Sequence, residues 1–238
     1  MKKLLGILTI GLMSMTVQTA HQTTQPVVGT VEGFDKLPEM KLALFTLGAD
    51  FPIEIGTVNK GGDFSIDLSQ ATLPADMAEE DMAVFFGGLH TAFDGAFSRD
   101  DFGLLADVIA LKNPYISIMA SRNRWAGNVF PVTSEEVKNW LEDSAYNNAV
   151  IGSYLNIIYV EEPITLDYSA SSKMPYQGEE ILQEYQFKLT LEPGFNWVQY
   201  DIEEVYETDP KIRGSFPSKI TIRNMDDSSQ FRWIGKFF

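Results

Sequence analysis

The residues of this chain best placed for chemistry are three acids that follow a histidine. His90 lies in the glycine-containing stretch 87–91, and Asp94, Asp100 and Asp101 follow it closely. Carboxylate oxygens are the ligands that calcium prefers, and a histidine beside a carboxylate can act as a general base. The stretch lacks the alternating acids and the closing glutamate of an EF-hand. It leaves two hypotheses open: a calcium site formed by the three aspartates, or a solvated loop with a hydrogen-bonded histidine.

A tryptophan preceded by two arginines is the second candidate group. Trp125 lies in the polar, glycine-containing segment 121–128, just after Arg122 and Arg124. An exposed indole ring can stack on a sugar or a protein partner, and guanidinium groups supply hydrogen bonds. The segment therefore predicts a ligand-binding group of Arg122, Arg124 and Trp125 with a carbohydrate or protein partner. The alternative is an indole ring that packs against its neighbours.

Composition excludes several other kinds of site. The 238 residues include 18 Lys+Arg, 33 Asp+Glu, two histidines and no cysteine, for a net charge of −15. A disulfide framework, a thiolate nucleophile and a cysteine-ligated metal are therefore excluded. The acidic balance disfavours nucleic acid, whose phosphates need a basic surface. Because no catalytic set is assembled, the chain favours a non-catalytic binding or cell-surface interaction protein without a cofactor, and a carboxylate-dependent, calcium-assisted hydrolase is the alternative.

Residues 1–20 have the pattern of a secretory signal peptide. Lys2 and Lys3 precede the apolar stretch 4–17, and Ala20 offers a small residue for cleavage. The stretch is shorter than the ~20 residues of a membrane-spanning helix, which disfavours an uncleaved anchor. We therefore predict export to the periplasm, the cell surface or the medium, and a mature chain with no transmembrane helix. Cleavage would change the net charge from −15 to −17 and leave residues 21–25 as a flexible leader.

Residues 26–125 have the short β-branched and aromatic segments of antiparallel β structure. The asparagine and glycines of 59–62 predict a tight turn, and the segments on either side alternate as the two strands of a hairpin. Residues 73–113 are irregular, with a short helix predicted over 101–111. The predicted strands are 26–33, 40–47, 52–58, 63–68 and 115–120.

Residues 126–238 combine one helix with further strands. Ser134 is followed by two glutamates, and Val137, Trp140 and Leu141 share one face, so the pattern predicts a capped helix over 134–146. The predicted strands after it are 151–160, 164–168, 184–191, 195–205, 219–223 and 231–237. The predicted fold is mainly β: two antiparallel β-sandwich-like regions, 26–125 and 126–238, with a short helical insertion between them.

Two segments carry resemblances to known groups of proteins. The strands IEIGTV and GGDFSIDL resemble the start of transthyretin-like or carboxypeptidase-regulatory-like domains. The segments SYLNIIYVEEPITLDY and YQFKLTLEPGFNWVQYDIEEV resemble a group of secreted bacterial β-sandwich proteins, in which a tryptophan is common at the position of Phe195. The first resemblance implies a structural or adhesive module. The second implies a sandwich fold and carries over no functional residue.

Charge is unevenly distributed along the second half of the chain. Residues 161–209 hold 12 acids and 2 bases, whereas residues 211–238 hold 6 bases and 2 acids. This predicts ion pairing between neighbouring strands. The alternative is a polarised surface that docks a charged partner. The alternating apolar residues of 231–237 and the terminal Phe238 are also typical of a small outer-membrane β-barrel, which is the second alternative function.

Overall fold

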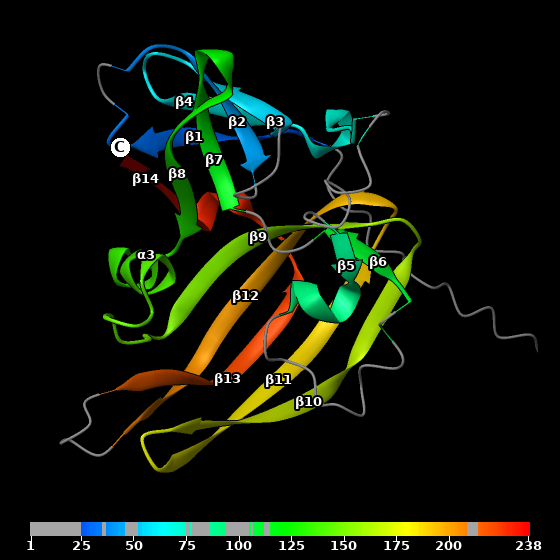
Figure 1. Cartoon of the computed structure of the whole chain (residues 1–238), viewed down its shortest axis with the longest axis vertical. Helices are drawn as coiled ribbons and strands as arrows, with labels where there is room; N and C mark the ends of the chain where they lie inside the picture. The colour runs from blue at the N-terminus through cyan, green and yellow to red at the C-terminus, as the bar shows by residue number, and fades with distance from the viewer. Residues whose placement is uncertain are drawn as a thin grey trace, which may run out of the picture.

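The structure is a computed structural model that describes residues 25–34, 37–45, 52–74, 77, 86–93, 105, 107–111, 115–208 and 214–238. The predicted signal peptide lies outside the described residues, as do Asp94, Asp100 and Asp101. The described strands form one continuous 14-stranded sheet, so the predicted mainly-β class is confirmed (Figure 1). Among the described residues, no helix is long and apolar enough to cross a membrane.

Seven strands form a closed barrel. They pair in the ring order β1–β4–β3–β2–β7–β8–β14, and β14 closes the ring by pairing in parallel with β1. Closure leaves no strand edge unpaired within the ring. The strands are β1 (Val27–Glu32), β2 (Met40–Phe45), β3 (Ile53–Val58), β4 (Asp63–Ile66), β7 (Tyr115–Ala120), β8 (Arg124–Val132) and β14 (Arg232–Phe237).

Apolar side chains fill the barrel. Trp233 of β14 lies 4.5 Å from the ring of Phe64, centroid to centroid, and both side chains belong to one buried cluster with residues of every barrel strand. On the surface, Arg232 donates two hydrogen bonds of 2.8 and 2.6 Å to the carboxylate of Glu32. The last strand is therefore held to the first by both packing and an ion pair.

Five further strands continue the sheet beyond the barrel. They run in the order β9–β12–β13–β11–β10, and β9 meets β8 where Tyr154 pairs with Val132. We call these five strands the open sheet, because β10 pairs with β11 alone among the described strands. The strands are β9 (Gly152–Val160), β10 (Ile164–Tyr176), β11 (Glu179–Leu191), β12 (Gly194–Glu207) and β13 (Ser215–Asn224).

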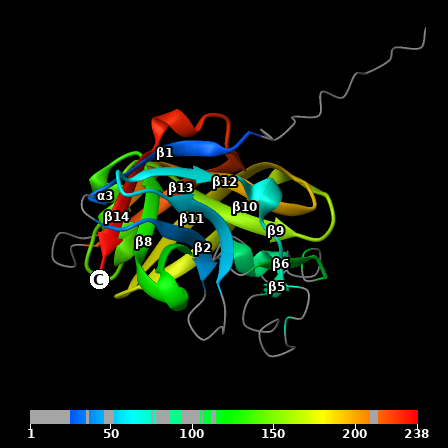
Figure 2. The ribbon, with the colours of Figure 1, turned by 90° about the horizontal axis from the view of Figure 1, so that it is seen from above.

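Short elements lie around the open sheet. Helix α3 (Glu135–Glu142) and the strand pair β5 (Phe86–Gly88) and β6 (Ile109–Leu111) lie at opposite sides of the molecule (Figures 1 and 2). Strand β6 pairs with β9 at Val160. The one-turn helices are η1 (Leu68–Gln70), η2 (Leu89–Ala92), η3 (Ser121–Asn123) and η4 (Ser228–Gln230).

The open sheet has two chemically different faces. Its inner face carries a buried cluster that includes Ile158, Val198 and Phe187. Its outer face carries polar side chains such as Asp201 and Arg223, which alternate along the strands with the inner-face residues. Near the barrel, outer-face residues of β9 and β12 join the barrel core instead, and Trp197 meets Trp233 edge to face at 5.8 Å.

The structure differs from the expected pair of sandwiches. One closed barrel and an open sheet replace them, and residue 125, the expected boundary, lies inside β8. The physical reason is that the last strand of the chain pairs with the first. A prediction that pairs consecutive segments misses such a contact. Helix α3 begins at its predicted cap, where the Ser134 hydroxyl accepts a hydrogen bond from the Val137 N–H, but it ends at Glu142 rather than at 146.

Candidate functional site

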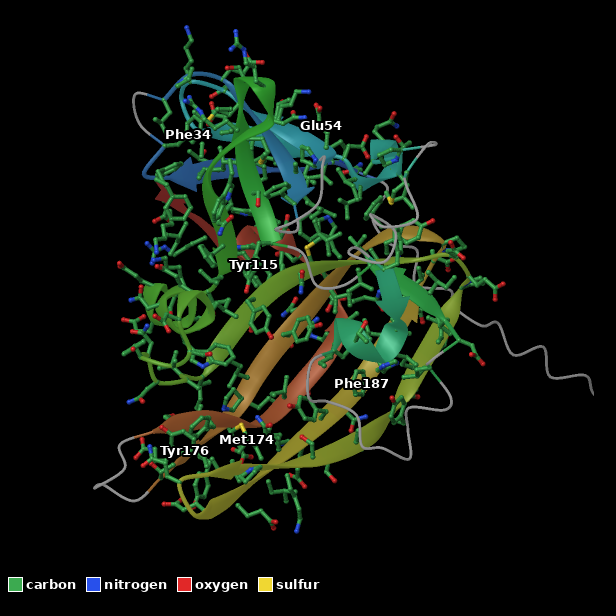
Figure 3. The ribbon with its side chains drawn as sticks, viewed as in Figure 1. Phe34, Glu54, Tyr115, Met174, Tyr176 and Phe187 are labelled. Carbon is green, nitrogen blue, oxygen red and sulfur yellow. The ribbon has the colours of Figure 1, made fainter. Side chains whose placement is uncertain are left out.

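The inner face of the open sheet contains a hollow of about 450 Å³. Strands β9 to β13 form its floor and one side, helix α3 contributes a tryptophan, and the residues after β5 contribute Ala92 and Phe93. Met174 and Phe187, labelled in Figure 3, lie on this face. The lining residues are Ala92, Phe93, Trp140, Ser144, Tyr154, Asn156, Met174, Gln183, Tyr185, Tyr200, Phe216, Pro217, Ile220 and Ile222.

Aromatic rings form one wall of the hollow. Tyr154 of β9 and Tyr200 of β12 are directly opposite each other in the antiparallel register, and their rings stack at 4.7 Å with an angle of 8°. Trp140 approaches Tyr154 edge to face at 6.3 Å. Directly opposed residues share one face of a sheet, so register alone brings the two tyrosines together. The result is a row of three aromatic rings beside the cavity.

The remaining lining combines aliphatic groups with uncharged polar groups. Gln183 donates from its amide nitrogen to the Pro217 carbonyl at 3.0 Å, which fixes the orientation of the amide. Burial raises the pKa of Tyr185 above its ordinary value, against the lowering effect of a hydrogen bond with Ser172. Tyr185 is therefore a neutral phenol at physiological pH. Among the described residues that line the hollow, none carries a formal charge at neutral pH.

Most of the described charges of the open sheet, Asp201 among them, lie on its outer face. Asp201 accepts hydrogen bonds from Ser153 at 2.6 Å, Gln199 at 2.7 Å and Arg223 at 2.7 Å. Burial acts to raise the pKa of Asp201, but these three hydrogen bonds outweigh it, and the pKa lies below its ordinary value. The carboxylate thus stays ionised, and its charge is directed away from the hollow.

The four described bases of the region 211–238 all form ion pairs. Lys219 lies 3.0 Å from Glu203, and Arg223 binds Asp201, so the predicted pairing between neighbouring strands is confirmed for these two bases. The other two described bases, Arg232 and Lys236, pair with Glu32 of β1 and Glu142 of α3.

The predicted group of Arg122, Arg124 and Trp125 is divided between two places. The Trp125 indole N–H donates to the Gly127 carbonyl at 2.9 Å, and its ring packs against Phe238 at 4.7 Å. Arg122 lines a separate hollow of about 350 Å³ beside Lys41, and neither Trp125 nor Arg124 lines that hollow. Trp125 remains 43% exposed, and ligand binding by Arg122, Arg124 and Trp125 stays a prediction.

The proposed calcium group cannot be placed, because Asp94, Asp100 and Asp101 lie outside the described residues. His90 is described and lies in η2, beside Leu89 and Ala92, which belong to the buried cluster of the inner face. Within the described part of the chain, no cluster of three or more acids or histidines has the geometry to hold a metal.

Reasoning from the sequence missed most of the hollow. Three tyrosines on three strands, Tyr154, Tyr185 and Tyr200, were the sequence signal of the hollow. The sequence does not give the order and register of the strands, so it could not show that these tyrosines lie on one face. Trp140 shares a helix face with the buried Val137, which predicted core packing, whereas the structure places it at the hollow. Comparison of the chain with protein-family models, curated proteins and solved structures finds no match.

Proposed function

We propose that this protein is a non-catalytic binding protein whose hollow holds a neutral, amphipathic small molecule. One observation supports the proposal most strongly. The chain carries a net charge of −15, yet the hollow is lined by aromatic, aliphatic and uncharged polar side chains. Charged residues are abundant in the chain, yet none of the described residues that line the hollow is charged.

The size and lining of the hollow suit such a ligand. A volume of about 450 Å³ falls in the usual range for small-molecule sites, roughly 300–1,000 Å³. The rings of Trp140, Tyr154 and Tyr200 offer flat apolar surface, and amide and hydroxyl groups nearby can orient a polar end. A charged ligand would lose its hydration without gaining an ionic partner, which costs free energy. A neutral ligand avoids that cost.

The features of residues 1–20 support a location outside the cytoplasm, in the periplasm, at the cell surface or in the medium. An exported binding protein meets its ligand there. A neutral sugar has an apolar face that can stack on an aromatic ring and hydroxyl groups that can form hydrogen bonds. A carbohydrate ligand is therefore included in this proposal.

Two dyes with the same ring system test the proposal. Phenylnaphthylamine is neutral, and anilinonaphthalene sulfonate carries one negative charge; both fluoresce on entering an apolar site. We expect the neutral dye to bind at least about tenfold more tightly, because none of the described lining residues offers the sulfonate a cation. Equal affinity, tighter binding of the sulfonate, or no binding of the neutral dye would contradict the proposal.

A matched pair of variants locates the site. Met174→Trp places a larger side chain in the hollow and should weaken binding of the neutral dye about tenfold or more. Met225→Trp makes the same substitution at a partly buried position beside the barrel cluster, and it should leave dye affinity unchanged. An equal loss in both variants would place the dye elsewhere.

A further inference from the structure

The free edge of β10 is long and regular. The 13 residues of Ile164–Tyr176 pair with β11 without a register shift. Among the described strands, none pairs with the other edge of β10. Exposed sheet edges are usually shortened, bulged or heavily charged, because their unpaired backbone groups can pair with another chain. Strand β10 has neither a short length nor a bulge as protection.

The charges of β10 are arranged symmetrically about its middle residue. Asp167 and Lys173 are the only charged side chains of the strand, and each lies three positions from Ala170. Both point to the outer face, because they alternate with the inner-face residues of β10. If two copies of β10 pair antiparallel about a two-fold axis at Ala170, each Asp167 lies directly opposite Lys173 of the other copy.

From this symmetry we propose that β10 is the contact edge of a homodimer, in which two open sheets join into one continuous sheet. Every residue of β10 finds a partner in this register, because Ala170 is the midpoint of Ile164–Tyr176. A two-fold axis makes each contact occur twice.

The inner-face residues of β10 are self-complementary in the same register. Leu166 lies opposite Met174 of the other copy, and Ile164 lies opposite Tyr176 of the other copy. These are apolar pairs, and cross-strand apolar pairs stabilise antiparallel sheets. The centre of the contact holds Ala170 and the three serines Ser169, Ser171 and Ser172 of each chain, whose small size allows two strands to approach closely.

Competing registers lack this complementarity. An antiparallel pairing centred on Asp167 or on Lys173 sets two like charges directly opposite each other. A parallel pairing in register places Asp167 beside Asp167 and Lys173 beside Lys173. Like charges in directly opposed positions destabilise a sheet, so the register centred on Ala170 is the one favoured by charge.

The absence of cysteine from the chain makes this register directly testable. In Ala170→Cys, the two cysteines of the dimer would face each other across the axis. Directly opposed residues of an antiparallel pair have Cα atoms about 4.5–5.5 Å apart, within the range of a disulfide. We expect mild oxidation to convert this variant to a covalent dimer. Val28→Cys, at a position 66% exposed on β1 of the closed barrel, is the control and should form no disulfide-linked dimer under the same conditions.

Charge reversal provides the second test. Asp167→Lys gives a strand with two lysines, and Lys173→Asp gives a strand with two aspartates, so each variant should self-associate about tenfold more weakly than the unaltered chain in sedimentation equilibrium. An equimolar mixture of the two variants restores both opposite-charge pairs and should form a heterodimer. Circular dichroism of each variant checks that the strands remain folded.

Three results would overturn the proposal. The unaltered chain could sediment as a monomer at all accessible concentrations, which would leave the edge free for another protein. Ala170→Cys could crosslink no faster than Val28→Cys. The charge-reversed variants could associate with themselves as strongly as with each other.

Discussion

The closed barrel and the open sheet belong to one ladder of strands, but they bury apolar side chains differently. In the barrel, the ring of seven strands encloses its own core, and side chains such as Phe34 and Leu42 are fully buried. In the described part of the chain, the inner face of the open sheet packs against short elements such as η2, and a hollow of about 450 Å³ remains. In the proposed function, the open sheet supplies the space for a ligand, whereas the barrel is filled by its own core.

Strands β9 and β12 link the two regions because both of their faces are buried. Ile157 and Trp197 point to the barrel core, whereas Ile158 and Val198 point to the inner face of the open sheet. Burial on both faces explains why consecutive residues of these strands, such as Ile157 with Ile158 and Trp197 with Val198, are both apolar. It also holds the floor of the hollow to the barrel.

The largest expected loss of stability comes from truncating a buried aromatic side chain in each region. Trp233→Ala removes a ring that contacts Phe64 and Trp197, and it should lower the free energy of unfolding by about 3–5 kcal/mol. Tyr200→Ala removes a ring that borders the hollow and should cost only about 2 kcal/mol, because fewer contacts are lost beside existing space. Denaturant unfolding measures both values. Equal losses would show that the inner face is packed as tightly as the barrel.

Neutralising one carboxylate in each region should change the stability less. Asp201→Asn should cost about 1–2 kcal/mol at neutral pH, because Asp201 accepts three hydrogen bonds and is only partly exposed. Glu32→Gln on the barrel should cost less than about 0.5 kcal/mol, since solvent screens its exposed pair with Arg232.

The stabilising effect of Asp201 depends on pH. The pKa of Asp201 in the folded protein is lowered from the ordinary value of 3.8, so its stabilising effect is fully present above that pH. The effect is lost as the pH falls through the lowered value. The difference in stability between the unaltered chain and Asp201→Asn should therefore shrink in acid. A constant difference across this range would show that the ionised carboxylate is not the stabilising species.

The last comparison is between a turn in each region. Gln177 and Gly178 join β10 to β11 with φ angles of 47° and 93°. Asparagine adopts a positive φ such as that of Gln177 more easily than glutamine does. Gln177→Asn should raise the free energy of unfolding by about 0.5 kcal/mol, which a slightly higher melting temperature would show. The reverse substitution in the barrel, Asn59→Gln, should cost about 1 kcal/mol, because the Asn59 carbonyl oxygen accepts from the N–H groups of Gly61 and Asp63. Changes of the same sign in both variants would contradict this account of the turns.

Local features of the fold were predictable from the sequence, and long-range pairing was not. The turn at 59–62 and the start of α3 follow from residues that are adjacent in the chain, and the structure confirms both. The parallel pairing of β14 with β1 joins segments about 200 residues apart, as the Arg232–Glu32 contact shows. No local pattern encodes that contact.

The candidate site was harder to predict for the same reason. Trp125 stood out because its neighbours are polar, yet its ring packs on Phe238, a residue far along the chain. Tyr154 and Tyr200 did not stand out, since aromatic residues on strands usually pack in a core. Their stacking beside a hollow depends on the antiparallel register of β9 and β12.

Methyl resonances of methionine test the central claim most directly, because methionines line both hollows. Met174 lies at the hollow of the open sheet, whereas Met40 and Met119 lie at the smaller hollow on the barrel. In a protein with isotope-labelled methionine methyl groups, addition of the neutral dye should shift the Met174 resonance and leave Met40 and Met119 unchanged. A shift confined to Met40 and Met119, or no shift at Met174 when the dye is bound, would contradict the assignment of binding to the open sheet.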